Sequence, residues 1–153
     1  MVSRCGCVRS EPDPIAMSLH AETQSLALRA ARQMIADMAR ACGAPSAVLG
    51  DLEIAVGEIL GNAQRHAYHG GVGPVRVDVR CDERSIEIVI HDEGAPLVQA
   101  PRVPVAPSLG DRGSLGLYIT RQLVDILEIT HPARDERGTA VRLVKRFDTT
   151  PTH

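Results

Sequence analysis

The chain has 153 residues, the usual size of one domain with a substantial hydrophobic core. Only 2% of the residues are aromatic, so stacking on nucleic-acid bases is not expected as the main activity. The formal net charge of −2 argues against a dominant contact with a nucleic-acid backbone, although it does not exclude the binding of one nucleotide.

The cysteines and the hydropathy pattern indicate the compartment. The four cysteines include no CxxC pair, which favours reduced thiols over a disulfide framework or a structural zinc site. No apolar run approaches the ~18 residues of a membrane span, and no secretory segment follows Met1. We therefore expect a cytoplasmic protein without membrane contact.

The first part of the chain predicts a tail, a short strand and a helix. Residues 1–15 lack periodicity and are predicted to be a disordered tail, and residues 16–20 are predicted to form a strand. From 21 to 41 an apolar residue recurs at every fourth position, which predicts an amphipathic helix. These apolar positions are Leu26, Ala30, Met34 and Met38.

A second helix is predicted from Pro45, a residue tolerated at the first helical position, to His69, which two glycines follow. One side of this helix is apolar. Its members are Leu52, Val56, Ile59 and Ala63.

The opposite side of the second helix carries a narrow polar stripe. Glu58, Asn62 and His66 lie four residues apart, and each such step turns a helix by only about 40° beyond a full turn. An amide oxygen is a suitable hard ligand for Mg²⁺, and a carboxylate one turn away is a suitable general base. The solvated face of an amphipathic helix would show the same pattern. His66 and His69 have the spacing of metal ligands, but no third ligand is evident.

After the second helix the period changes from four to two. Residues 74–81 and 85–91 alternate apolar and polar side chains, which predicts a β-hairpin with one dry face. A second strand pair is predicted at 126–130 and 139–146, after a helix over 115–124. This order of elements predicts an α+β fold, with a mostly antiparallel sheet and helices on one face.

Two motifs lie beside these strands. At the end of the second strand, Asp92 can accept a hydrogen bond from an exocyclic amine while the backbone at Gly94 passes close by. The same residues also fit an ordinary turn. Thr139 opens the last strand, where its hydroxyl either reaches a ligand or stays at the strand edge.

A third motif ends a long segment without periodicity. Residues 94–113 contain four prolines, and a loop of this length is usually functional or disordered. The loop leads through Arg112, Gly113 and Gly116 into a helix, whose free N–H groups would attract phosphate. A flexible helix entry without a ligand is the alternative interpretation.

Taken in order, these motifs resemble those of the GHKL ATPase superfamily, which has the Bergerat nucleotide-binding fold. The small bacterial anti-sigma factors that are serine-protein kinases are the most similar group. The likeness covers residues 16–147, followed by a short tail over 148–153, and it implies a two-layer α/β sandwich. The sheet would be mixed, mostly antiparallel, and covered on one face by helices. The motifs are EILGNAQRHAY at 58–68, HDEGAP at 91–96, RGSLGLYI at 112–119 and RGT at 137–139.

The resemblance implies that the chain binds ATP and Mg²⁺. Asn62 would ligate Mg²⁺, and Glu58 would be the catalytic base that deprotonates the attacking hydroxyl. Asp92 would bind the amino group of adenine, and Gly94 would let the base lie flat.

The other roles implied by the resemblance concern the phosphates and the lid. Residues 96–113 would form the ATP lid, and Gly113 and Gly116 would bring backbone N–H groups to the phosphates. His66 and Arg112 would assist at the same end. Thr139 would help to hold adenine.

The implied function is that of an anti-sigma factor and serine/threonine-protein kinase. It would phosphorylate an antagonist protein and sequester a sigma factor, as a homodimer without direct contact with nucleic acid. Two alternatives stay open. One is a non-catalytic module that binds a nucleotide or a partner, and the other is a detached histidine-kinase catalytic domain.

Overall fold

The computed structural model describes residues 13–95, 106, 112–131 and 137–149, so most of the predicted tails and lid lie outside it. None of the helices in these ranges is long and apolar enough to cross a membrane. The elements in chain order are β1 (Ile15–Glu22), α1 (Ser25–Ala41), α2 (Ser46–Asn62), a π-helical turn η1 (Ala63–Ala67), β2 (Pro74–Cys81), β3 (Ser85–Asp92), α3 (Arg112–Leu123), β4 (Ile126–Thr130) and β5 (Thr139–Arg146).

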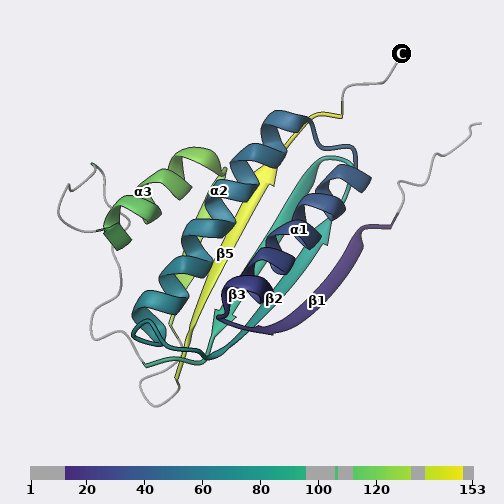
Figure 1. Ribbon diagram of the computed structural model, residues 1–153. Helices are drawn as coiled ribbons and strands as arrows, with labels where there is room; N and C mark the ends of the chain where they lie inside the picture. Colours follow the sequence, from purple (N-terminus) through teal and green to yellow (C-terminus); the bar gives the residue numbers. More distant parts are fainter. Residues whose placement is uncertain (1–12, 96–105, 107–111, 132–136, 150–153) are drawn as a thin grey trace, which may run out of the picture.

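The strands form one sheet with the order β1-β2-β3-β5-β4, and each of these pairings is antiparallel. All three α-helices lie on the same face of the sheet (Figure 1). The predicted two-layer sandwich is therefore confirmed. Strands β2, β4 and β5 have the predicted bounds, and in β2 and β5 the period-two pattern follows the burial of alternate side chains.

The core lies between the helices and the sheet and is almost entirely aliphatic. Full burial of one such side chain stabilises the fold by roughly 1.5–3 kcal/mol. The largest fully buried apolar side chains are Ile35 of α1, Leu52, Val56 and Leu60 of α2, Val77 of β2, Ile86, Ile88 and Ile90 of β3, and Leu143 of β5. All four apolar residues predicted for the second helix are buried.

The predicted apolar stripe of α1 is wrong in its first half. Leu26 is 79% exposed and Ala30 is exposed, whereas the buried residues of α1 are Leu28, Ala31, Ile35, Met38 and Ala39. A strict four-residue step drifts by about 40° each time, so it leaves the buried face after two or three steps. The real stripe alternates steps of three and four residues.

Two helix bounds also differ from the prediction. Helix α1 begins at Ser25 and not at residue 21, because β1 continues to Glu22 and pairs there with Pro74. The second helix becomes the π-helical turn η1 after Asn62, and the chain then reverses through positive φ angles at His69 and Gly70.

Thr23 connects the end of β1 to the start of β2 and was not singled out in the sequence. Its side chain is fully buried. The hydroxyl accepts a hydrogen bond from the N–H of Gly73 (3.0 Å) and donates one to the carbonyl of Gly71 (3.2 Å). The N–H of Thr23 donates to the carbonyl of Gly73 (2.9 Å). Three hydrogen bonds thus fix the loop that precedes β2.

Replacing Thr23 by Val keeps the shape of the side chain and removes its hydroxyl. We expect the free energy of unfolding to fall by about 1–3 kcal/mol, because the N–H of Gly73 loses its partner in a buried position. Urea denaturation measures the change. The matched control is Thr130→Val at an exposed position of β4. Equal stabilities of the two variants would contradict a structural role for the Thr23 hydroxyl.

Candidate active site

The candidate residues gather in two groups at one end of the molecule. Glu58 and Asn62 lie in the C-terminal half of α2, and Asp92 and Thr139 lie where β3 ends and β5 begins. Figure 1 shows that the C-terminal end of α2 and these strand ends lie at the same end of the sandwich. A direct contact joins them, because Gly94 lies against Ala67 just after α2.

Glu58 is half-buried because α3 packs over it. A Cβ atom added at Gly116 would collide with the Glu58 carboxylate, so the backbone of α3 lies directly against this side chain. Within the described ranges no hydrogen bond or ion pair engages this carboxylate. Glu58 is therefore covered by a neighbouring helix, and its carboxylate oxygens remain available as hydrogen-bond acceptors.

The side-chain oxygen of Asn62 accepts a hydrogen bond from the Arg65 guanidinium (2.9 Å), which also lies over Gly61. This oxygen thus faces a cationic group, and Glu58 lies one turn earlier on the helix. Sequence reasoning missed Arg65, although its position three residues after Asn62 on a helix is a recognisable signal.

The side-chain oxygen of Asn62 is the kind of hard ligand that a magnesium ion prefers. The described residues hold no cluster of three or more His, Cys, Asp or Glu side chains that could bind a metal alone. Mg²⁺ is usually bound by one or two protein groups together with substrate phosphates, so one amide oxygen is compatible with a metal that arrives with its substrate.

The other residues predicted at the phosphate end are arranged differently. His66 is exposed in η1, where the wider π-helical turn interrupts the four-residue stripe. Helix α3 begins at Arg112, three residues earlier than predicted. Gly113 is thus in the first turn, where N–H groups have no partner within the helix, whereas Gly116 is one turn further in. The Arg112 side chain lies outside the described part of the structure.

Asp92 and Thr139 are directly paired between β3 and β5, on the sheet face that the helices cover. The Asp92 carboxylate accepts hydrogen bonds from the backbone N–H groups of Gly94 (3.0 Å) and Thr139. Burial raises the pKa of Asp92, while these two bonds and the nearby His131 and His91 act in the opposite direction. The carboxylate is fixed by the backbone and retains further acceptor capacity for a ligand.

Two features around Asp92 add to the sequence prediction, which included Gly138 in the motif at 137–139 but did not include His131. Gly138 has a φ of 105°, and a side chain there would collide with the Asp92 carbonyl, so only glycine fits. The Nε2 atom of His131 is buried without a hydrogen-bond partner among the described residues. His131 follows β4 directly, and it lies near enough to Asp92 to lower the pKa of the Asp92 carboxyl group.

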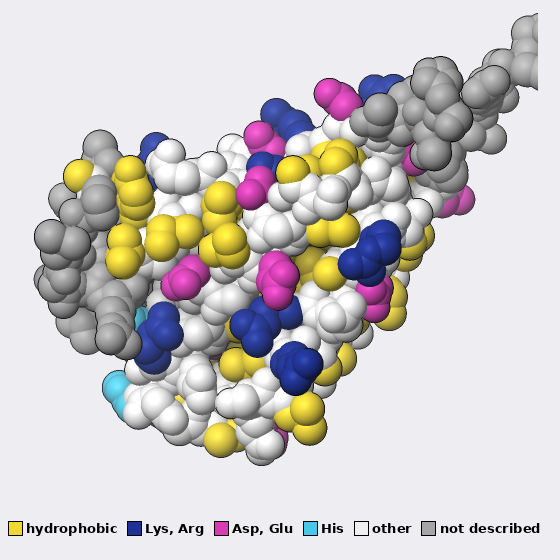
Figure 2. Space-filling view, turned by 45° about the horizontal axis from the view of Figure 1, so that its top comes forward, with side chains coloured by type: hydrophobic (Ala, Val, Ile, Leu, Met, Phe, Trp, Pro, Cys, Tyr) yellow, Lys and Arg dark blue, Asp and Glu magenta, His cyan; other side chains and the backbone are white. Residues whose placement is uncertain are grey.

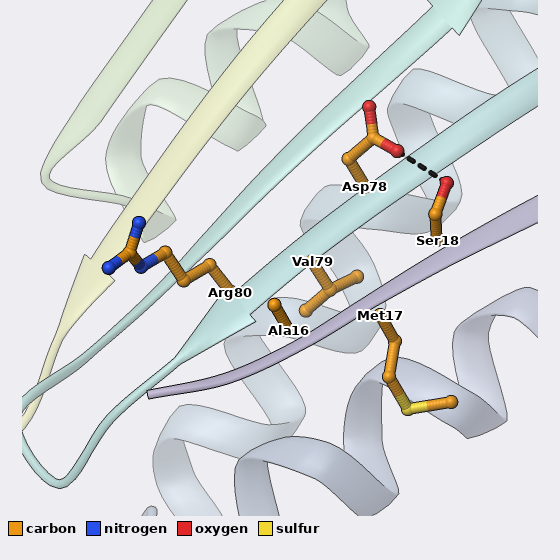
Figure 3. Close-up of a pocket in the computed structure, with 6 residues that line it drawn as sticks. All are labelled: Ala16, Met17, Ser18, Asp78, Val79 and Arg80. Atoms are coloured by element: carbon orange, nitrogen blue, oxygen red, sulfur yellow. Dashed lines mark hydrogen bonds between the residues drawn. The ribbon is translucent and has the colours of Figure 1, made fainter. Parts of the chain in front are cut away.

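One hollow of the described surface lies away from the candidate residues. A shallow hollow between β1 and β2 is lined by Ala16, Met17, Ser18, Asp78, Val79 and Arg80 (Figure 3), none of which is a candidate residue. On the face shown in Figure 2, basic, acidic and apolar side chains are interspersed. That face therefore has no continuous positive field for nucleic acid.

The fold and these motifs agree with a known family. Residues 21–145 match the model of the histidine kinase-like ATPase domain, and the chain belongs to this family. It is similar to the serine-protein kinase RsbW of Bacillus cereus (strain AH820), with 28% identity over 142 residues that cover 87% of this chain and 84% of the relative. The same values hold for the serine-protein kinase RsbW of Bacillus anthracis.

A solved structure supports the fold. The crystal structure of the RsbU and RsbW domains of Rv1364c from Mycobacterium tuberculosis superimposes with a TM-score of 0.59 and 19% sequence identity. The match covers 88% of this chain and 32% of that longer chain. At this identity the likeness concerns the fold alone.

The contact between Gly116 and Glu58 predicts a steric effect. Gly116→Ala should change the free energy of unfolding by less than about 1 kcal/mol, because the Glu58 carboxylate at the end of its side chain moves aside and the gain in helix propensity offsets the crowding. The control is Gly50→Ala in α2, where nothing lies within 4 Å of the added carbon and we expect a gain of about 1 kcal/mol. Chemical denaturation measures both. Combining Gly116→Ala with Glu58→Ala should remove the crowding and give a gain similar to that of Gly50→Ala, whereas a loss of about 3 kcal/mol or more in Gly116→Ala alone would contradict a movable carboxylate.

The environment of Asp92 predicts its titration. Its pKa should lie above the ordinary aspartate value of about 3.9, since burial penalises the charged form. The pKa of Asp82 should lie below that value, because the backbone N–H groups of Arg84 and Ser85 bind its carboxylate. Carboxyl carbon chemical shifts followed through a pH titration by NMR measure both values.

The raised pKa of Asp92 has a consequence for stability. The folded state holds this proton more tightly than the unfolded chain does, so the Asp92 contribution to the free energy of unfolding decreases as the pH rises from about 3.9 through the raised value. The Asp82 contribution has the opposite sign. A pKa of Asp92 at or below that of Asp82 would contradict this description of the site.

Proposed function

We propose that this chain is an ATP-dependent serine/threonine-protein kinase of the anti-sigma factor type. It phosphorylates an antagonist protein and, when the antagonist is phosphorylated, sequesters a sigma factor. One observation carries the proposal. Glu58 lies under α3 with a carboxylate free of described hydrogen bonds, one turn before Asn62 and at the same end of the sandwich as Asp92. The similarity to serine-protein kinases named RsbW supports it.

The base end of the proposed ATP site consists of Asp92, Gly94 and Thr139. The Asp92 carboxylate accepts a hydrogen bond from the amino group of adenine, and its backbone hydrogen bonds hold it in place for this contact. Thr139, opposite Asp92 in the next strand, contributes its hydroxyl to the same pocket. The contact of Gly94 with Ala67 brings the turn after β3 against the end of α2.

The phosphate end consists of Asn62, the first turn of α3 and Glu58. Asn62 would hold Mg²⁺, which when bound neutralises phosphate charge. The N–H group of Gly113 would bind the phosphates, and Arg112 and His66 would assist at the same end. Glu58 takes the proton from a serine hydroxyl as its oxygen attacks the terminal phosphorus and ADP leaves. Phosphoryl transfer depends mainly on such positioning and on electrostatic stabilisation.

The proposed kinase activity also implies a compartment, a kind of partner and an oligomeric state. The protein acts in the cytoplasm on protein partners, as a homodimer, and without direct contact with nucleic acid or membrane. The mixed charge of the face in Figure 2 is compatible with protein partners.

The decisive experiment incubates the purified chain with ATP labelled at the terminal phosphate, Mg²⁺ and candidate antagonist proteins. Acid-stable phosphoserine on an antagonist supports the proposal. Acid-labile phosphohistidine would replace it by a histidine-kinase catalytic domain that acts on a separate partner. Binding of ATP without any protein phosphorylation would replace it by a non-catalytic module.

Glu58→Gln separates catalysis from binding. We expect phosphoryl transfer to slow by about 10²-fold or more, the scale of a lost general base, with little change in ATP affinity. The control is Glu53→Gln, an exposed carboxylate of the same helix, which should leave the rate unchanged. Single-turnover rates and calorimetric titration measure the two properties. Equal transfer rates in wild type and Glu58→Gln would exclude this role of Glu58.

A further inference from the structure

Tyr68 holds two separate backbone segments with one hydroxyl group. The hydroxyl accepts a hydrogen bond from the N–H of Glu93 (2.8 Å) and donates one to the carbonyl of Pro74 (2.5 Å). Burial raises the pKa of Tyr68, so the hydroxyl remains protonated and can serve as donor and acceptor at neutral pH. The turn after β3 is thereby attached to the first residue of β2.

The ring of Tyr68 is itself fixed in place. A Cβ atom added at Gly73 would overlap the ring, so the ring lies directly on the backbone there. The N–H of Gly73 donates to the hydroxyl of buried Thr23 (3.0 Å), which stops this backbone from moving away. The Tyr68 hydroxyl therefore has a defined position before any ligand arrives.

A second contact reinforces the first. The N–H of Ala95 donates to the carbonyl of Ala67 (3.2 Å), and Gly94 lies against the same residue. Consecutive residues 67 and 68 thus contact the three residues that follow Asp92. Of these contacts, only the bond to the Tyr68 hydroxyl depends on a polar side chain.

We propose that Tyr68 is a positioning residue for base recognition, and this inference rests on the proposed ATP site. By holding the N–H of Glu93, Tyr68 fixes the backbone that orients the neighbouring Asp92 carboxylate. Tyr68 itself does not contact the nucleotide. Loss of its hydroxyl should loosen the base end of the site and leave the phosphate end intact.

Tyr68→Phe tests the proposal, because it keeps the ring on Gly73 and removes both hydrogen bonds. We expect affinity for Mg²⁺–ATP to fall by about 2- to 10-fold, the effect of one or two hydrogen bonds, and the preference for ATP over GTP to narrow. Affinity for Mg²⁺–tripolyphosphate, which has no base, should not change. Calorimetric titrations measure all three ligands. The control Ser18→Ala removes a hydroxyl bonded to Asp78 (2.6 Å) on β2 and should alter none of them.

A further measurement requires no nucleotide. The amide hydrogen of Glu93 should exchange at least several-fold faster in Tyr68→Phe than in wild type, while core amides such as that of Ile88 should not change. A wild type that binds ATP, with unchanged affinities and unchanged Glu93 exchange in the variant, would overturn the role of Tyr68 alone. Equal weakening for ATP and tripolyphosphate would show a general structural effect and would also overturn it. A folded wild type that binds no ATP would overturn the proposed function together with this inference.

Discussion

The arrangement of the site depends on the close contact between the end of α2 and the turn after β3. Gly94 meets Ala67 without an intervening side chain, and the Tyr68 hydroxyl binds the N–H of Glu93. Helix α2 is fixed on the sheet by its buried aliphatic stripe, which in turn sets the position of Glu58 and Asn62. A one-residue slip of β3 would turn the Asp92 side chain to the sheet face that the helices do not cover.

The π-helical turn η1 makes this contact geometrically accessible. An α-helix continued beyond Asn62 would carry residues 67 and 68 further along its axis, whereas the wider turn changes their direction at the end of the site. The chain then reverses through a positive φ at His69 and at Gly70. Histidine adopts this left-handed conformation more readily than most residues other than glycine, so the reversal fits the residue present. The irregular backbone is thus concentrated where the end of α2 meets the turn after β3.

The fold was largely predictable because its strands bury one face, and a period of two then defines both register and bounds. The buried stripe of α1 was not predicted correctly, because a fixed spacing of four residues differs from the helical period of 3.6 residues. In the candidate site, Glu58 and Asp92 could be proposed from the sequence, because a carboxylate suits a general base or a hydrogen-bond acceptor and its neighbours in the chain complete the motif. The roles of Thr23 and Tyr68 were not recognisable, because they depend on backbone groups that only the fold brings near. Gly73 lies 50 residues from Thr23, and Glu93 lies 25 residues from Tyr68. His66 followed the expected stripe only on the assumption of a regular helix.

The two ends of α3 are held in very different ways, and this difference matters for a site that must admit a nucleotide. At the C-terminal end, Lys145 donates to the carbonyl of Leu123 (2.7 Å) and pairs with Asp51 of α2 (2.9 Å), in a largely buried position. Near the N-terminal end, the described contact is the backbone of Gly116 against the Glu58 carboxylate, with no hydrogen bond between them. Displacing this contact costs little, whereas detaching Lys145 would leave a poorly solvated charge without its partner. The last turn of α3 is thus fixed on α2, whereas the contact at Gly116 can yield; in the proposed site the phosphate end would then adjust to its ligand and the base end would be fixed in advance.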